Sequence, residues 1–329
     1  MRILSSFVIV IFTLLLFSCS NDFDLTEPAK EIPVVYGLIN AADTAQFVRV
    51  EKAFIDENIP GNELAMNPSN LYFEDIEVKL RHDATGTELN LIRVDGNDYG
   101  LQRASGAFAQ APNYIYRLAT KTNPLIAKDS YSLIIRKSDG SILSSATTRV
   151  LSNYVNSDVI TPNPTALLSF GYNTDFRISW SADENAVIHD IQLVLNYTEE
   201  RPSTPITKKS VIWNMTRNYD RTTYITKGRD FYEYLARTLP EEPFVNRYFD
   251  NFTLIITSGG KEIRDYISVG QANTGITSSG EIPVYSNLTN GGLGVFSSRS
   301  QFIRQNIGIA PASLDSLRNG SITKSLNFK

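Results

Sequence analysis

The sequence predicts a mainly β protein with two β-sandwich domains of immunoglobulin or fibronectin type, the second carrying one or two short helices. Its 329 residues include 17 Phe and 16 Tyr but only 3 Met, and aromatic residues are enriched in strands. Short runs of alternating apolar and polar residues recur along the chain, separated by turns rich in Gly, Asn, Asp and Ser. A proline-containing segment divides these runs into two series, which predicts two domains.

Residues 1–18 have the features of a lipoprotein signal peptide. Arg2 supplies a positive charge, residues 3–17 are almost wholly apolar, and Leu16-Phe17-Ser18 precede Cys19 as in a lipobox. This apolar run is shorter than the roughly 20 residues that a transmembrane helix needs, so a signal peptide is favoured. A secretory signal cut nearby is the remaining alternative.

Lipidation of Cys19, with palmitate among the acyl chains, predicts attachment to the outer membrane, at its periplasmic face or at the cell surface. Several acyl chains anchor a protein stably, whereas one binds only marginally. Cys19 is the only cysteine, so no thiol remains for disulfide, metal or nucleophilic chemistry. The formal net charge of −4 argues against nucleic-acid binding, which needs a basic surface. Polar, acidic residues 19–30 are interpreted as a tether.

The first sandwich domain is predicted over residues 31–150. It opens with a hairpin, because strand-like runs at 32–39 and 46–52 flank a polar turn. A long polar loop follows at 56–70, with a short helical piece near 63–66. The later strands of this domain are predicted at 76–82, 88–94, 113–118, 128–135 and 142–150.

Residues 151–164 are interpreted as a linker, and residues 165–329 as the second β-rich domain. Strand 176–180 ends in a tryptophan and precedes a polar turn and a long alternating run at 187–197. This order resembles the early strands of a fibronectin-like sandwich, although a chance likeness between β proteins remains the alternative. Further strands are predicted at 208–216, 252–257 and 262–269, the last two as a hairpin around Ser258-Gly259-Gly260.

Two helices are predicted in the second domain. Asp230 is a suitable N-cap for a helix at 231–239, whose apolar residues follow helical spacing and which Pro240 ends. A short last helix at 314–318 follows Pro311.

Few residues suggest catalysis, and no enzyme activity, cofactor or metal site is expected. The only histidines, His82 and His189, are interpreted as ordinary surface or strand-end residues, and no catalytic or nucleotide-binding motif occurs. Three pairs of adjacent acids could be considered as catalytic carboxylates. Neighbouring side chains of a strand point to opposite faces and would not converge on a substrate, so these pairs are assigned to charged turns. These pairs are Glu74/Asp75, Glu199/Glu200 and Glu241/Glu242.

The run Asn290-Gly291-Gly292-Leu293-Gly294 is the most distinctive internal segment. Glycine-rich loops cradle phosphates in some proteins, but no Lys-Ser/Thr pair follows here. The glycines are therefore interpreted as allowing a strand entry to bend tightly against packed aromatic residues.

Three stretches resemble a family of uncharacterised Bacteroidota lipoproteins, a domain of unknown function often encoded near TonB-dependent receptors. They read IPVVYGLI at 32–39, FVRVEKAF at 47–54 and PVYSNLTNGGLGVF at 283–296. The resemblance covers most of the mature chain and carries over no active site. In that phylum, acids after the lipidated cysteine act as a surface-export tag, which residues 20–24 match only loosely. The triplets Asp43-Thr44-Ala45 and Asp315-Ser316-Leu317 match its O-glycosylation sequon, at Thr44 and Ser316.

The leading hypothesis is a non-enzymatic binding or accessory subunit of an envelope complex, with a TonB-dependent transporter as partner. A second hypothesis is direct capture of glycans or peptides through exposed aromatic residues, and a third is a hydrolase that uses paired carboxylates. The aromatic candidates are Tyr72, Phe73, Tyr114, Tyr116, Trp213 and Tyr219.

Overall fold

The computed structural model describes residues 31–54, 59–163, 165–272 and 284–329. The predicted signal peptide, Cys19 and the tether lie outside these residues, as does part of the loop at 56–70. Within the described ranges the protein is mainly β, as the sequence predicts. Its strands form one large open sheet and a small one, with a few short helices.

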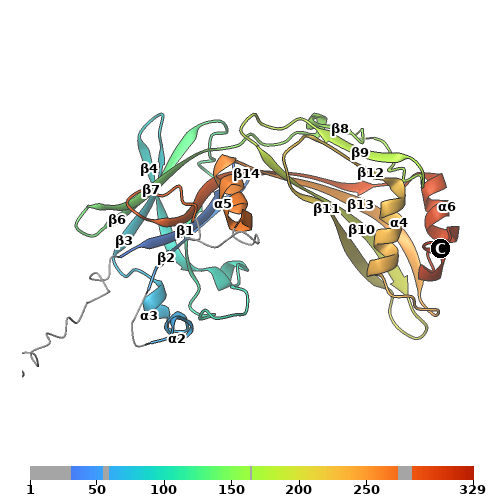
Figure 1. The fold of residues 1–329 in the computed structure, drawn as a ribbon, viewed down its shortest axis with the longest axis horizontal. Helices are drawn as coiled ribbons and strands as arrows, with labels where there is room; N and C mark the ends of the chain where they lie inside the picture. The colour runs from blue at the N-terminus through green and yellow to red at the C-terminus, as the bar shows by residue number, and fades with distance from the viewer. Residues whose placement is uncertain (1–30, 55–58, 164, 273–283) are drawn as a thin grey trace, which may run out of the picture. The chain divides into compact units, whose positions relative to one another are not determined.

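The large sheet joins strands from both ends of the chain (Figure 1). All of its neighbouring strands are antiparallel except β1 and β14, which run parallel. In sheet order the strands are β11 (Thr207–Tyr219), β10 (Ile188–Glu200), β13 (Asn246–Gly259), β14 (Leu293–Ile307), β1 (Pro33–Ile39), β2 (Ala45–Lys52), β5 (Tyr114–Ala119), β4 (Thr87–Asp95), β3 (Ile76–His82), β6 (Ser130–Lys137) and β7 (Ile142–Arg149).

Strands β1 to β7 match the series predicted for the first part of the chain, and the β1–β2 hairpin is confirmed. Alternate side chains, such as Val35, Val48 and Val50, point into a common hydrophobic core. Strand β4 changes partner along its length. Its first residues pair with β3, up to Leu91 opposite Val78, and its last residues pair with β5.

Strand β14 is held against β1 by a close backbone approach at Gly294. Gly294 has φ of +102°, and a Cβ there would lie 2.0 Å from the carbonyl oxygen of Val35. Only glycine fits this position without strain. The interpretation of the glycines as a structural device is confirmed, whereas the 15-residue strand that follows them was not predicted beyond its entry.

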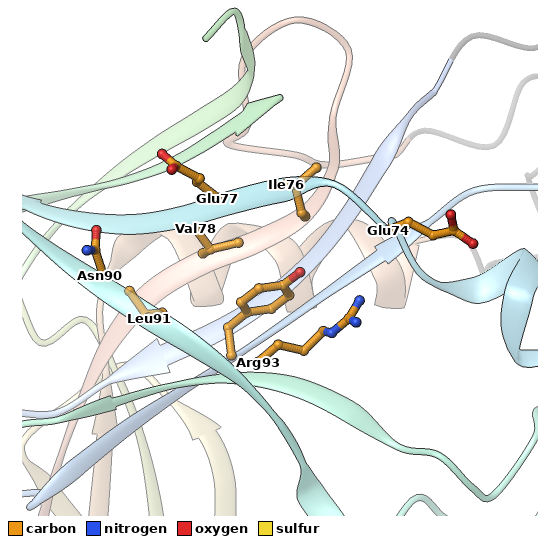
Figure 2. A pocket seen from close by; sticks show the side chains of 8 residues that line it. Glu74, Ile76, Glu77, Val78, Asn90, Leu91 and Arg93 are labelled. Atoms are coloured by element: carbon orange, nitrogen blue, oxygen red, sulfur yellow. The ribbon is translucent and has the colours of Figure 1, made fainter. Parts of the chain in front are cut away.

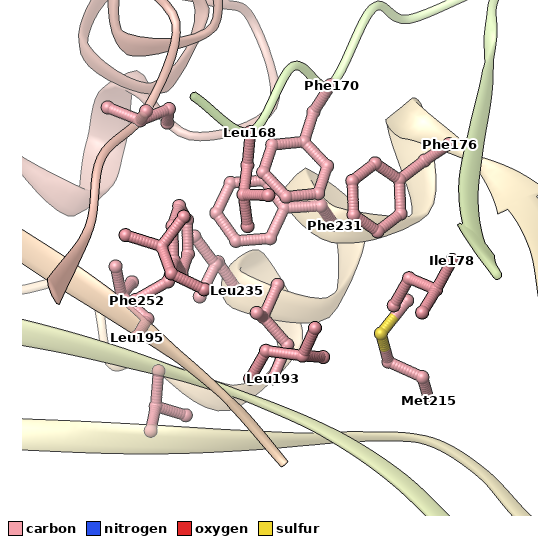
Figure 3. Close-up of a cluster of buried hydrophobic side chains, with 14 of the residues drawn as sticks. Leu168, Phe170, Phe176, Ile178, Leu193, Leu195, Met215, Phe231, Leu235 and Phe252 are labelled. Atoms are coloured by element: carbon pink, nitrogen blue, oxygen red, sulfur yellow. The ribbon is translucent and has the colours of Figure 1, made fainter. Parts of the chain in front are cut away.

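The second core is rich in aromatic residues (Figure 3). Phe170 stacks on Phe231 with ring centroids 4.2 Å apart, and Phe252 contacts both rings edge-on. Leu193 and Leu195 of β10 close this core from the large sheet. A small sheet also contributes to this core, formed by β8 (Val159–Thr161), β9 (Asp175–Trp180) and β12 (Thr223–Lys227). Strand β8 lies inside residues 151–164, which were predicted to be a linker.

Helix α4 (Gly228–Thr238) is the predicted central helix, but it begins earlier than expected. Asp230 is therefore not the N-cap. It occupies the third helical position, where its carboxylate accepts a hydrogen bond from the backbone N–H of Lys227 at 3.2 Å and another from the Thr226 hydroxyl. The last helix, α6 (Pro311–Asn319), is confirmed with Pro311 in its first turn. Near the long loop lie α2 (Gly61–Ala65) and α3 (Pro68–Leu71).

The hairpin predicted around Ser258-Gly259-Gly260 is wrong, because its second arm is helix α5 (Lys261–Ala272). Lys261 and Asp265 form an i,i+4 ion pair at 2.9 Å, which supports a helix. The Glu262 carboxylate accepts hydrogen bonds from Thr148 at 3.0 Å and from Ser297 at 2.9 Å. These contacts fix α5 to β7 and β14, and the alternation of Ile263, Ile267 and Val269 that suggested a strand is compatible with a helix too.

Candidate functional site

The predicted modification sites have different surroundings. Cys19 lies outside the described residues. Thr44 is exposed in the turn between β1 and β2. Ser316 is half-buried in α6, where its hydroxyl donates a hydrogen bond to the carbonyl oxygen of Ala312 at 3.0 Å. Thr44 is therefore the more accessible acceptor of the two.

Both histidines lie at strand ends, as one of the two interpretations expected, but both are buried, so the interpretation as surface residues is wrong. His82 Nε2 lies 2.7 Å from an Asp129 carboxylate oxygen. His189 Nδ1 lies 2.6 Å from Ser258 Oγ, and that hydroxyl lies 2.6 Å from the hydroxyl of Tyr154. Each imidazole thus belongs to a separate hydrogen-bonded group.

The His189–Ser258–Tyr154 chain has the residue types of a nucleophile and its base, but its environment argues for a structural role. Burial lowers the pKa of His189 to about 4. Burial also raises the pKa of Tyr154 to about 12. Ser258 is fully buried, and a nucleophile must be reached by its substrate. The chain therefore stabilises the packing of β13 against β10.

Glu199 is a buried strand residue, which corrects its assignment to a charged turn. Its side chain is 2% exposed and lies between three cations: Lys209 at 2.6 Å, Arg247 at 3.0 Å and Arg201 at 3.2 Å. Burial raises the pKa of the Glu199 carboxyl, but hydrogen bonds from Lys209, Arg247 and Arg201 outweigh burial and hold the pKa below its usual value. Glu199 is therefore ionised at neutral pH and stabilises this end of the sheet.

Arg247 is the fully buried partner of Glu199, and it also holds the C-terminal segment. Its guanidinium donates hydrogen bonds to the carbonyl oxygens of Leu326 at 2.7 Å and Pro240 at 3.1 Å. Of the other acidic pairs, Glu242 binds Arg201 at 2.6 Å. These charges link the strands to the C-terminal segment.

Three carboxylates line a hollow of about 280 Å³ near the start of the second core: Asp158, Asp183 and Glu184. Burial raises the pKa of Asp183, but hydrogen bonds from Ser152 and Asn185 outweigh it and hold the pKa low. A carboxyl group that acts as a general acid needs the opposite change, a raised pKa. Asp183 therefore lacks the raised pKa of a general acid.

Three of the six aromatic residues expected to be exposed are in fact buried, namely Tyr72, Phe73 and Tyr116. The Tyr72 hydroxyl donates a hydrogen bond to the carbonyl oxygen of Pro112 at 3.0 Å, which closes the loop above it. The remaining three are half-buried in packing contacts, and they do not form a common surface: Tyr114, Trp213 and Tyr219.

Large apolar side chains gather instead on the outer face of β1, β2, β5 and β4, opposite the first core. This outer face comprises Tyr36, Leu38, Phe47, Ile92, Tyr99 and Arg117. The Tyr36, Leu38, Ile92 and Tyr99 side chains are 43%, 38%, 68% and 45% exposed. Phe47 is opposite Arg117, and Arg117 is opposite Ile92. Gly37 pairs with Val48, so Leu38 lies beside Phe47 and the row crosses four strands.

Arg117 lies at the centre of the outer face and has no carboxylate partner among the described residues. Its guanidinium stands 5.2 Å from the ring centroid of Tyr99, which in turn lies 5.7 Å from that of Phe47. The nearby Glu51 is already paired, with Arg49 at 3.0 Å and with Arg103. The outer face is therefore apolar with an uncompensated positive charge.

The sequence contained a signal for this surface. Residues 34–39 (Val-Val-Tyr-Gly-Leu-Ile) are apolar at both alternating sets of positions. A strand with only one buried face alternates with polar residues, so its second apolar face indicated a further contact.

No family model matches the sequence, and no curated protein matches it. Among the described residues no helix has the length and apolar character to cross a membrane. Within the same ranges, no cluster of three or more His, Cys, Asp or Glu residues is placed to hold a metal ion.

Proposed function

We propose that this protein is a lipid-anchored, non-enzymatic accessory subunit of an outer-membrane complex, and that it docks onto its partner through the outer face. The exposed apolar row around Arg117 is the observation that carries this proposal. The lipobox at Cys19 supports membrane anchoring, and the family resemblance supports a TonB-dependent receptor as the partner. We also propose that the protein is divided into two sandwich domains, with the linker at residues 151–164.

The chemistry of the outer face is that of a protein interface. Contiguous exposed apolar surface rimmed by polar residues marks interaction sites, and each fully buried Ile or Leu contributes about 1.5–3 kcal/mol. Tyrosine and arginine are enriched among the residues that dominate binding energy. The expected partner surface is apolar and presents a carboxylate to Arg117.

The absence of any other cysteine in the mature chain allows a direct test. In cells that make the lipoprotein, Ile92→Cys places a single free thiol on the outer face, provided Cys19 is lipidated. A thiol-reactive photo-crosslinker at this position is expected to join the protein to a TonB-dependent receptor, identified by mass spectrometry. Ile160→Cys is the matched control, because Ile160 is 62% exposed on β8 and Ile92 is 68% exposed on β4.

Equal crosslinking from both positions, or none from Ile92→Cys, would contradict docking through this face.

A negative charge placed on the outer face gives a second test. Leu38→Asp is expected to weaken co-purification of the receptor at least about tenfold, because a buried unpaired carboxylate is costly. Leu38 is 38% exposed, so the substitution leaves the core intact and the thermal unfolding of the variant checks this.

The alternative of glycan or peptide capture keeps only three of its six exposed-aromatic candidates, because Tyr72, Phe73 and Tyr116 are buried.

A further inference from the structure

A small hollow opens where β4 leaves β3 (Figure 2). Leu91 of β4 is still opposite Val78 of β3, but the next residue, Ile92, already pairs with β5. The start of β3 pairs only with β6, at Ile76 and Glu77. The two strands therefore diverge, and the space between them has a volume of about 200 Å³.

The size and floor of the hollow suit a small aliphatic group. Ile76, Val78, Leu91 and Tyr116 provide apolar walls. Pockets for drug-sized ligands have volumes of about 300–1,000 Å³, so this smaller hollow suits a ligand of about the size of an amino acid.

Tyr116 supplies a hydroxyl that the protein itself does not use. The residue is 5% exposed and lines the hollow, yet its hydroxyl makes no hydrogen bond with any described residue. The hydroxyl oxygen itself is not fully buried, so the hollow leaves it accessible to water or to a ligand. Burial raises the pKa of Tyr116 while Arg93 lowers it, and the net increase keeps the hydroxyl protonated as a donor.

Two opposite charges without ion-pair partners stand at one end of the hollow. Arg93 lies over the ring of Tyr114 at 4.7 Å and donates one hydrogen bond, to the carbonyl oxygen of Phe73 at 3.1 Å. Neither Arg93 nor Glu74 forms an ion pair with any described residue. Glu77 differs, because Lys79 binds it at 3.2 Å, and Figure 2 shows Glu77 at the other end, beside Asn90.

We propose that this hollow binds a free α-amino acid with a small aliphatic side chain. The ligand carboxylate binds the Arg93 guanidinium and the Tyr116 hydroxyl, and the ligand ammonium binds Glu74. The side chain rests on Ile76 and Leu91. Arginine suits this role because its planar fork matches a carboxylate. A simple anion would face Glu74 unpaired and a simple cation would face Arg93, so the site favours a zwitterion. The inference does not depend on docking through the outer face.

Isothermal titration calorimetry of the purified, detergent-solubilised lipoprotein tests the assignment, with L-valine as the probe. Two valine analogues separate its charges: 3-methylbutanoate lacks the ammonium group and L-valinamide lacks the carboxylate. Each analogue is expected to bind at least about tenfold more weakly than L-valine, since a charged hydrogen bond contributes about 1.5–3 kcal/mol.

Variants of the protein give the matching evidence. Arg93→Gln and Glu74→Gln are each expected to weaken L-valine binding at least about tenfold, and Tyr116→Phe several-fold. Glu77→Gln is the matched control and is expected to bind as the wild type does. Failure of L-valine to bind the wild type would overturn the proposal. Equal affinity for L-valine and both analogues, or an effect of Glu77→Gln as large as that of Glu74→Gln, would do so as well. If Arg93→Gln fails to fold, the exposed Glu74→Gln variant and the analogues still decide the question.

Discussion

The buried imidazole of His189 makes the stability of the protein depend on pH. His189 is 2% exposed at the start of β10, its Nδ1 lies 2.6 Å from the Ser258 hydroxyl, and Trp180 packs edge-on against its ring. Burial lowers its pKa to about 4, although Asp190 and Asp220 raise it slightly. The folded protein therefore keeps this imidazole neutral under conditions that protonate it in the unfolded chain.

The direction and size of the effect follow from the two pKa values. Between about 4 and the ordinary value of 6.5, the unfolded chain binds a proton at His189 that the folded protein does not bind. The free energy of unfolding then rises with pH. At about 1.36 kcal/mol per pH unit, the gap corresponds to about 3 kcal/mol. This stability is present above pH 6.5 and is lost as the pH falls towards 4.

Urea unfolding of the wild type and of His189→Gln, at about pH 7 and about pH 4, measures this term. Glutamine keeps a polar side chain near Ser258 but does not titrate, and the carboxylates contribute equally to both proteins. The wild type is expected to lose about 3 kcal/mol more than the variant over this interval.

A spectroscopic measurement provides an independent check. The chain has only two histidines, so His82→Gln leaves His189 as the single imidazole in an NMR titration, with an expected midpoint near 4. Parallel pH profiles for wild type and His189→Gln, or a midpoint near 6.5, would refute the reasoning.

Three further predictions, two of them with a matched control substitution, test other parts of the structure. Gly294→Ala is expected to lower the free energy of unfolding by at least about 2 kcal/mol, because its Cβ would meet the β1 backbone at 2.0 Å; Gly100→Ala, at φ +72° with open space around it, costs about 1 kcal/mol. Arg247→Met is expected to lower the free energy of unfolding in urea by about 3 kcal/mol and to expose the C-terminal segment to proteases. Arg201 is a partly exposed partner of the same Glu199 carboxylate, so Arg201→Met is expected to cost under about 1 kcal/mol. Thr44→Ala is expected to remove a glycan mass from protein isolated from its native host; an unchanged intact mass would contradict glycosylation at this turn.

Local patterns predicted most strands of the protein, because those strands bury one face. Strands β3 and β10 alternate apolar and polar residues with a period of two, and this period is itself a consequence of strand geometry. Strand β14 escaped prediction beyond its first residues. Its buried positions, on both faces, include Ser297, Ser298 and Ser300, so its sequence lacks the apolar alternation on which the prediction depended.

The pairing of β14 with β1 was beyond the reach of local reasoning. Ser298 shows why: its hydroxyl donates to the carbonyl oxygen of Ile39 at 3.2 Å and accepts from the backbone N–H of Leu151 at 2.9 Å. From the sequence alone, a serine in a strand is expected to face solvent, because its hydrogen-bond partners lie far away in the chain. The same holds for Glu199, whose burial depends on cations from β11 and β13.

The outer face and the hollow were missed for a shared physical reason. Sequence patterns identify residues that a fold must bury, but each candidate site depends on groups that find no partner within the fold: the exposed Ile92 side chain and the Tyr116 hydroxyl. Adjacent positions of β4 serve both sites, since Ile92 points outwards and Arg93 lines the hollow. A ligand bound to Arg93 would therefore lie one residue away from Ile92 of the outer face. If both proposals hold, occupancy of the hollow is expected to change crosslinking from Ile92→Cys, and L-valine titrated into that assay measures the coupling.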